Sequence, residues 1–114
     1  MFVLSHCKII AITYTGIMNS IRVDIPLDHG LDLQTYLVAH PAATFFMRAK
    51  GISSLAEGVL HNDLLIVDRS LCPKCGSLVI AIVDGELHIK RFNPQFEYEI
   101  WGVVTYAIHD VRVN

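Results

Sequence analysis

The sequence predicts a mostly β, compact and twisted domain with one or two short helices. Most apolar residues fall in short runs rich in β-branched side chains, which are typical of strands. Asp84-Gly85 separates two such runs and is a strong signal for a two-residue hairpin. Helical periodicity is confined mainly to residues 31–40, and Pro41 ends that segment.

Each element follows from these local signals. Six strands are predicted, at residues 8–14, 42–50, 63–68, 77–83, 86–92 and 99–109. The helix over residues 31–40 places Leu33, Leu37 and Val38 on one face. A one-turn helix is predicted at residues 54–57, and Gly58 ends it. Residues 17–29, with Pro26 and two aspartates, are expected to be irregular.

Composition limits the classes of partner. With 114 residues, 53% apolar and 18% charged, the chain is expected to fold as a globular domain. The net charge of −2 and the scattered basic residues argue against direct nucleic-acid binding. No apolar run is long enough to span a membrane, and no signal peptide is predicted. Three cysteines do not make a disulfide framework, so a cytoplasmic location is expected.

The segment Cys72-Pro73-Lys74-Cys75-Gly76 has the spacing of half a zinc knuckle. A closed zinc site needs four ligands, and a redox Cys-x-x-Cys pair opens a helix after a strand. A plain turn before the strand at residues 77–83 is therefore the preferred interpretation, although the metal and redox interpretations stay open. We expect neither a metal ion nor a cofactor.

Ser53 and Lys90 are the candidate catalytic residues. A serine hydroxyl is a weak nucleophile and needs an adjacent base, and a lysine serves as that base when it has lost its proton. Strand alternation places Glu86, His88 and Lys90 on one face of the predicted strand at residues 86–92. His88 is therefore near the candidate base, but a structural or surface role is preferred for it. Backbone amides around Ser53 are expected to hold a developing oxyanion.

The sequence around these two residues resembles that of a known family. The matching blocks fall in one order: residues 31–46, 62–71, 78–86, 89–91 and 99–105. They resemble the UmuD/LexA family, the Ser-Lys self-cleaving proteins of the bacterial SOS response to DNA damage, and most closely the UmuD-type subunits of error-prone polymerases. The spacing from Ser53 to Lys90 is also similar to that between nucleophile and base in the family.

The resemblance implies a LexA/UmuD C-terminal fold of the β-clip type, with residues 31–114 as the peptidase domain. Residues 1–30 are then an N-terminal arm or an additional strand. It implies a serine peptidase that cleaves itself, with Ser53 as nucleophile and Lys90 as general base. It also implies a homodimer, stimulation by an activated RecA filament, and a UmuC-like Y-family polymerase partner for translesion synthesis in SOS mutagenesis and DNA repair.

This sequence departs from the family pattern at four places. Gly51-Ile52-Ser53-Ser54 stands where the family has Gly-Asp-Ser-Met, and Ser54 is the less favoured alternative nucleophile. Residues 1–30 contain no Cys-Gly or Ala-Gly bond of the kind that the family cleaves. The connection after Lys90 is short, as if a hairpin were removed, and His61-Asn62-Asp63 replaces an acidic-Gly-Asp turn.

Two hypotheses follow from the resemblance, and a third is less favoured. In the first, the Ser53–Lys90 pair processes the chain, which then joins the polymerase. In the second, the pair is catalytically silent and the chain acts only as a dimeric polymerase partner that is not processed. In the third, the chain is a fragment of a phage- or plasmid-type repressor, although residues 1–30 contain no helix-turn-helix signal.

Overall fold

The computed structural model describes residues 20–24, 30, 32–51 and 58–113. The chain divides into two compact units, Met1–Gly30 and Leu31–Asn114. In the first unit, residues 20–24 have no regular secondary structure, and Arg22 pairs with Asp24 at 2.9 Å. The strand predicted at residues 8–14 lies outside the described residues, as does the one-turn helix predicted at residues 54–57.

The second unit begins with the short helix α2 (Leu33–Leu37). The Asp32 carboxylate caps it by accepting the backbone N–H groups of Gln34 at 3.1 Å and Thr35 at 3.4 Å. The predicted helix is therefore confirmed but is shorter than expected. Leu33 and Leu37, one turn apart, share a face of this helix as predicted, and Leu33 is 60% exposed. No helix within the described part of the chain has the length and apolar character needed to cross a membrane.

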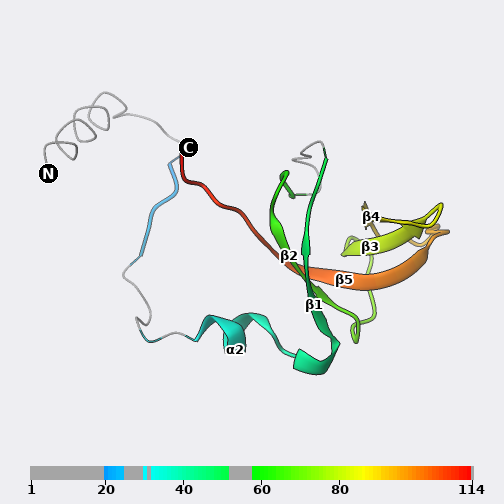
Figure 1. Ribbon diagram of the computed structural model, residues 1–114, viewed down its shortest axis with the longest axis horizontal. Coiled ribbons are helices and arrows are strands. Elements are labelled where there is room, and N and C mark those ends of the chain that lie inside the picture. Colours follow the sequence, from blue (N-terminus) through cyan, green and yellow to red (C-terminus); the bar gives the residue numbers. More distant parts are fainter. Residues whose placement is uncertain (1–19, 25–29, 31, 52–57, 114) are drawn as a thin grey trace, which may run out of the picture. The chain divides into compact units, whose positions relative to one another are not determined.

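Within the described residues, five strands form one antiparallel sheet, which confirms the mostly β prediction (Figure 1). After a 3-10 turn η1 (Pro41–Ala43), the strands are β1 (Thr44–Arg48), β2 (Leu64–Asp68), β3 (Leu78–Val83), β4 (Glu86–Arg91) and β5 (Glu99–Ile108). Their order in the sheet is β1-β2-β5-β3-β4. Each of the five matches a strand predicted from the sequence, with no end shifted by more than two residues.

Strand β5 is the common partner of the two halves of the sheet. Its C-terminal part pairs with β2 and its N-terminal part with β3, and only Val103 pairs with both. The register skips Trp101 opposite β3 and Thr105 opposite β2, so β5 contains two bulges. Because a bulge inserts an additional residue and increases the local twist, the two halves of the sheet turn away from a common plane.

Side chains hold both bulges in place. The Arg69 side chain donates from Nε to the backbone carbonyl of Trp101 at 2.8 Å, and its guanidinium lies 4.3 Å from the centre of the Trp101 ring. The Phe45 ring meets the same indole edge-on at 5.2 Å. At the other bulge, the Thr105 hydroxyl donates to the Ile66 carbonyl at 3.2 Å. At each bulge, a side chain therefore donates a hydrogen bond to a nearby backbone carbonyl, that of Trp101 or that of Ile66.

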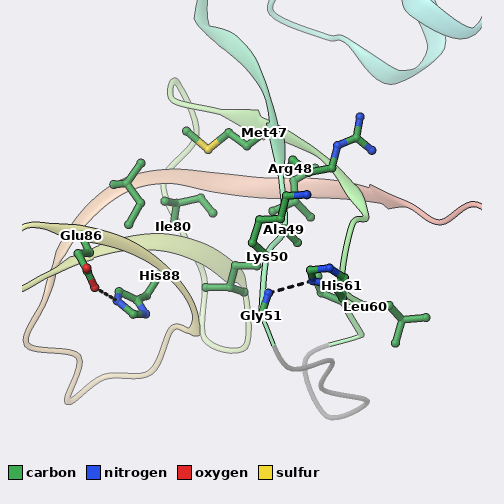
Figure 2. Close-up of a pocket in the computed structure, with 14 residues that line it drawn as sticks. Met47, Arg48, Ala49, Lys50, Gly51, Leu60, His61, Ile80, Glu86 and His88 are labelled. Atoms are coloured by element: carbon green, nitrogen blue, oxygen red, sulfur yellow. Dashed lines mark hydrogen bonds and ion pairs between the residues drawn. The ribbon is translucent and has the colours of Figure 1, made fainter.

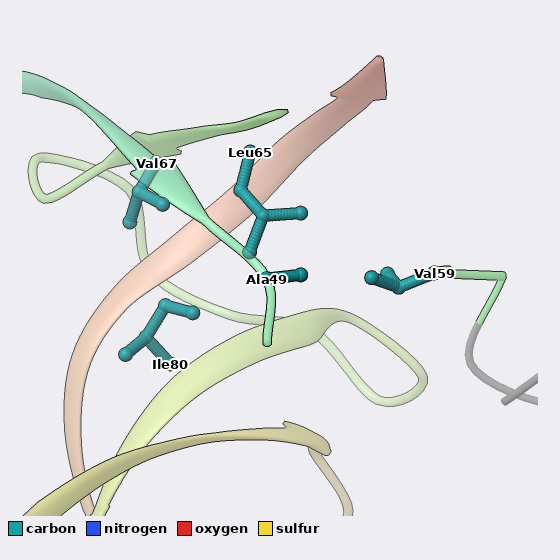
Figure 3. Packing of buried hydrophobic residues seen from close by; sticks show 5 residues of the cluster. All are labelled: Ala49, Val59, Leu65, Val67 and Ile80. Atoms are coloured by element: carbon teal, nitrogen blue, oxygen red, sulfur yellow. The ribbon is translucent and has the colours of Figure 1, made fainter. Parts of the chain in front are cut away.

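The main core cluster fills one face of the twisted sheet (Figure 3). Its buried members are Ala49, Val59, Leu65, Val67 and Ile80. Further apolar residues alternate with these along the strands and are buried as well: Ile66, Val79, Ala81 and Val103. Since neighbouring residues of a strand point to opposite faces, β2 and β3 are covered on both sides. This double burial explains their nearly continuous apolar sequence.

The β3–β4 hairpin turns where the sequence predicts. Asp84 has φ of 51° and Gly85 has φ of 80°, so both central residues are left-handed, as a type I′ turn requires. Val83 pairs with Glu86 directly across the turn. The turn therefore fixes the register of β4, and with it the position of Lys90 opposite Val79.

Two buried carboxylates flank β2. Asp63 is 2% exposed and Asp68 is 3% exposed. Asp63 accepts the Leu60 N–H at 2.9 Å and lies 2.8 Å from Nδ1 of His109. Asp63 therefore joins the turn that precedes β2 to the segment that follows β5.

At the other end of β2, Asp68 accepts both the N–H and the hydroxyl of Ser70, at 2.8 and 2.6 Å. Nδ1 of His40 lies 2.6 Å from its second oxygen. The hydrogen bond from the Ser70 hydroxyl is the main cause that lowers the pKa of Asp68 below its ordinary value. Burial opposes this shift, and the His40 ring adds to it.

Gly102 is required by a close approach between β5 and β2. A Cβ at this position would lie 2.7 Å from Cγ1 of Val67, which is fully buried. We expect Gly102→Ala to lower the free energy of unfolding by about 1–3 kcal/mol, measured by urea denaturation. The double variant with Val67→Ala tests the cause, because the smaller side chain leaves room. Strictly additive losses would contradict this explanation.

Removing the Ser70 hydroxyl should destabilise the fold in a pH-dependent way. Ser70→Ala is expected to lower the free energy of unfolding at pH 7 by about 1 kcal/mol. A lowered pKa stabilises the folded state only while the carboxylate is ionised, so this difference is present above about pH 4 and disappears as the pH falls through the folded pKa of Asp68. Urea denaturation at pH 7 and pH 3 measures it, with Ser20→Ala as the exposed control. An equal loss at both pH values would refute the explanation.

Candidate active site

Lys90, the predicted base, lies near the end of β4 and is half-buried. Its Nζ is 5.4 Å from the centre of the Tyr98 ring, a cation–π contact. Tyr98 belongs to a small aromatic cluster in the short connection between β4 and β5, where Phe96 contacts both Tyr98 and Phe92. The connection after Lys90 therefore supplies the ring that holds its ammonium group.

The predicted alternation along β4 is confirmed. Glu86, His88 and Lys90 pair across the hairpin with Val83, Ala81 and Val79, so they share one face of the strand. Nε2 of His88 lies 3.1 Å from a carboxylate oxygen of Glu86, and both residues are exposed. His88 is thus exposed and paired with Glu86.

A cavity of about 850 Å³ lies between the end of β1 and strand β4 (Figure 2). Its floor is apolar and includes Leu65 and Ile80 from the core. Its rim is polar, with Lys50, His61 and His88. The complete lining is Met47, Arg48, Ala49, Lys50, Gly51, Val59, Leu60, His61, Leu65, Ile80, Glu86, Leu87, His88 and Ile89. An apolar floor with a few polar groups at the rim is typical of a ligand or substrate site.

Ser53, the predicted nucleophile, and Ser54 lie outside the described residues. The residues on either side of their segment do line the cavity: Lys50 and Gly51 before it, Val59 and Leu60 after it. Four consecutive residues of β4, 86–89, line the same cavity. Lys90 itself is not part of that lining, and its ammonium group lies over Tyr98.

The chain entering the Ser53 segment is tied to the turn that precedes β2. The Ala49 carbonyl accepts the Asn62 N–H at 2.7 Å, and the Lys50 ammonium donates to the Asn62 side chain at 2.6 Å. The Gly51 N–H donates to Nδ1 of His61 at 3.0 Å. Sequence reasoning assigned no role to His61, because nothing local connects it with a residue ten positions earlier.

The Cys72–Cys75 segment forms a turn, as preferred from the sequence. Both cysteines are exposed and free. The Lys74 N–H donates to the Ser77 hydroxyl and the Ser77 N–H to the Lys74 carbonyl, both at 2.8 Å. Gly76 completes the turn with φ of 92°. Among the residues that the structure describes, no group of three or more His, Cys, Asp or Glu side chains is arranged to hold a metal ion.

Comparison with known proteins identifies the family of this chain. The Peptidase S24-like family matches residues 15–101. Protein ImpA of Escherichia coli is 43% identical, and the match covers 72% of this chain and 70% of ImpA. Protein MucA of Salmonella typhimurium is 38% identical, with 68% of each chain covered. The LexA repressor of Shewanella baltica is 43% identical over 54 residues, which are 47% of this chain and 26% of the repressor.

These matches confirm the resemblance deduced from the sequence blocks. The family match spans most of the β domain, from before α2 into β5. The matches to ImpA and MucA cover most of each protein, whereas the match to the LexA repressor is confined to a smaller part. The chain therefore belongs to the peptidase S24-like family, and within it to the UmuD-like proteins of SOS mutagenesis.

Proposed function

We propose that this chain cleaves itself through Ser53 and Lys90 and then acts as a homodimeric accessory subunit of a UmuC-like, error-prone Y-family polymerase in the cytoplasm. An activated RecA filament stimulates the cleavage. The observation that carries the proposal is the shared cavity: the residues flanking the Ser53 segment line it together with the strand that bears Lys90. Membership in the peptidase S24-like family supports the same chemistry.

In the proposed mechanism, the Ser53 hydroxyl attacks a backbone carbonyl while Lys90, in its neutral form, accepts the hydroxyl proton. Backbone N–H groups around Ser53 stabilise the oxyanion. The C–N bond then breaks, Lys90 returns the proton to the leaving amine, and an ester to Ser53 remains. Water, activated by Lys90, hydrolyses this ester and regenerates the serine.

This mechanism requires Lys90 to leave the Tyr98 ring. A lysine whose Nζ lies 5.4 Å from a ring centre is held there by attraction between its charge and the ring electrons. To reach the cavity, the ammonium group must give up that contact. Tyr98 thus favours a resting position of Lys90 outside the cavity.

The same contact favours an alternative function, in which the chain is a catalytically silent dimeric partner of the polymerase. Ile52 in place of the family aspartate points the same way. In that case Ser53→Ala leaves complementation of translesion synthesis intact, whereas variants that break the dimer abolish it. Full function from an obligate monomer would refute this alternative.

The primary test is the intact mass of the purified chain over time, at pH 7 and near pH 10. High pH favours the neutral form of lysine, so processing should be faster there. We expect two fragments whose masses sum to that of the chain plus one water, and no fragments from Ser53→Ala or Lys90→Ala. Fragments that persist in both variants would refute the assignment of nucleophile and base.

A second variant tests the resting position of Lys90. Tyr98→Leu removes the ring and should accelerate processing by about two- to fivefold, the equivalent of an exposed cation–π contact. Tyr98→Phe keeps the ring and should process at the parental rate. Equal rates for Tyr98→Leu and the parent would mean that the ring does not restrain Lys90.

A further inference from the structure

The hydrogen bond between Gly51 and His61 fixes the protonation of the His61 ring. A backbone N–H is always a donor, so Nδ1 of His61 must present its lone pair to Gly51 at 3.0 Å. The ring is therefore neutral, with its proton on Nε2. If the ring gains a second proton, Nδ1 becomes a donor that faces the Gly51 N–H, and the hydrogen bond is lost.

This bond acts at the point where the described chain enters the Ser53 segment. Ala49 and Lys50 are hydrogen-bonded to Asn62. Gly51 is the last residue that the structure describes before the segment that contains Ser53. Gly51 also has a backbone φ of 129°, which residues other than glycine rarely adopt. Its N–H bond to His61 thus sets the backbone direction two residues before Ser53.

We propose that His61 is a positioning residue for self-cleavage: it holds Gly51 only in its neutral form and releases Gly51 when the ring is protonated. This inference rests on the proposed Ser53–Lys90 reaction, because positioning has a catalytic consequence only if Ser53 is the nucleophile. The contact on which the inference rests is the one between Nδ1 of His61 and the backbone N–H of Gly51. The expected consequence is a loss of activity on mild acidification, separate from the protonation of Lys90.

His61 is exposed at the boundary of two cavities, so solvent protons reach it. Among the described residues, the charged and titratable groups around these cavities are Arg48 and Lys50 near β1, Glu86 and His88 on β4, and His109, Asp110 and Arg112 after β5. Asp63, two residues along, is buried and paired with His109. Imidazole groups change charge between pH 5 and 8, so His88 and His109 need controls of their own.

The first experiment measures the bond directly by NMR in the full-length Ser53→Ala chain, which cannot process. Between pH 8 and 5, the Gly51 amide proton should shift in step with the His61 ring, and Nδ1 should be the unprotonated nitrogen at pH 8. In His61→Asn, the side-chain oxygen takes the place of Nδ1 and does not titrate, so the Gly51 signal should stay constant. His88→Gln and His109→Gln are the matched controls, and the Gly51 titration should persist in both.

The second experiment compares processing rates of the active chain with those of its His61 variants. His61→Ala should process about five- to tenfold more slowly at pH 8, the equivalent of one lost hydrogen bond. His61→Asn should approach the parental rate at pH 8. Below pH 7 it should become faster than the parent, by no more than the five- to tenfold expected for His61→Ala, because only the parent loses the acceptor.

The outcomes separate this inference from the proposed function. A Gly51 amide that does not titrate with His61, or a ring with its proton on Nδ1 at pH 8, overturns the inference whether or not the chain processes. If the parent never processes but Gly51 titrates, the proposed reaction is wrong and the proton-dependent contact stands. If the parent processes and His61→Asn follows its pH profile throughout, His61 is not a positioning residue.

Discussion

The sheet depends on β5, because β5 alone joins its two halves. β2 pairs with the C-terminal part of β5 and β3 pairs with its N-terminal part, and Val103 pairs with both. The bulges at Trp101 and Thr105 turn the strand on both sides of this position. Gly102 lets the turning strand approach Val67 closely. The twist that shapes the whole domain is therefore concentrated in a few residues of one strand.

That twist also creates the candidate active site. Because the β3–β4 hairpin is turned relative to the β1–β2 pair, the end of β1 and strand β4 face each other across the cavity rather than lying in one plane (Figure 2). The two strands are at opposite edges of the sheet. The buried cluster of Leu65, Ile80 and their neighbours supports both walls. The same buried residues therefore form the core and support the cavity.

The parts of this structure that could be predicted from sequence have local causes. Asp84-Gly85 specifies a hairpin because both residues tolerate a left-handed backbone, and the hairpin then fixes the strand and face of Lys90. Trp101 looks like any strand residue, so its bulge depends on pairing with two partners at once. The contact of Lys90 with Tyr98 depends on the path of the intervening connection. His61 meets Gly51 because a tertiary turn brings them together, which no spacing rule anticipates.

The central place of β5 has a consequence for synthesis of the chain on the ribosome. β1 and β2 can pair early, and so can β3 and β4, because each pair is close in sequence. Until β5 emerges, however, β2 and β3 each have an inner edge of unpaired backbone N–H and C=O groups, and the faces of both strands carry many of the apolar side chains of the core. Open apolar edges attract chaperones and promote aggregation. The nascent chain therefore stays vulnerable until its last described strand has been made, and a truncation within β5 would leave it so permanently.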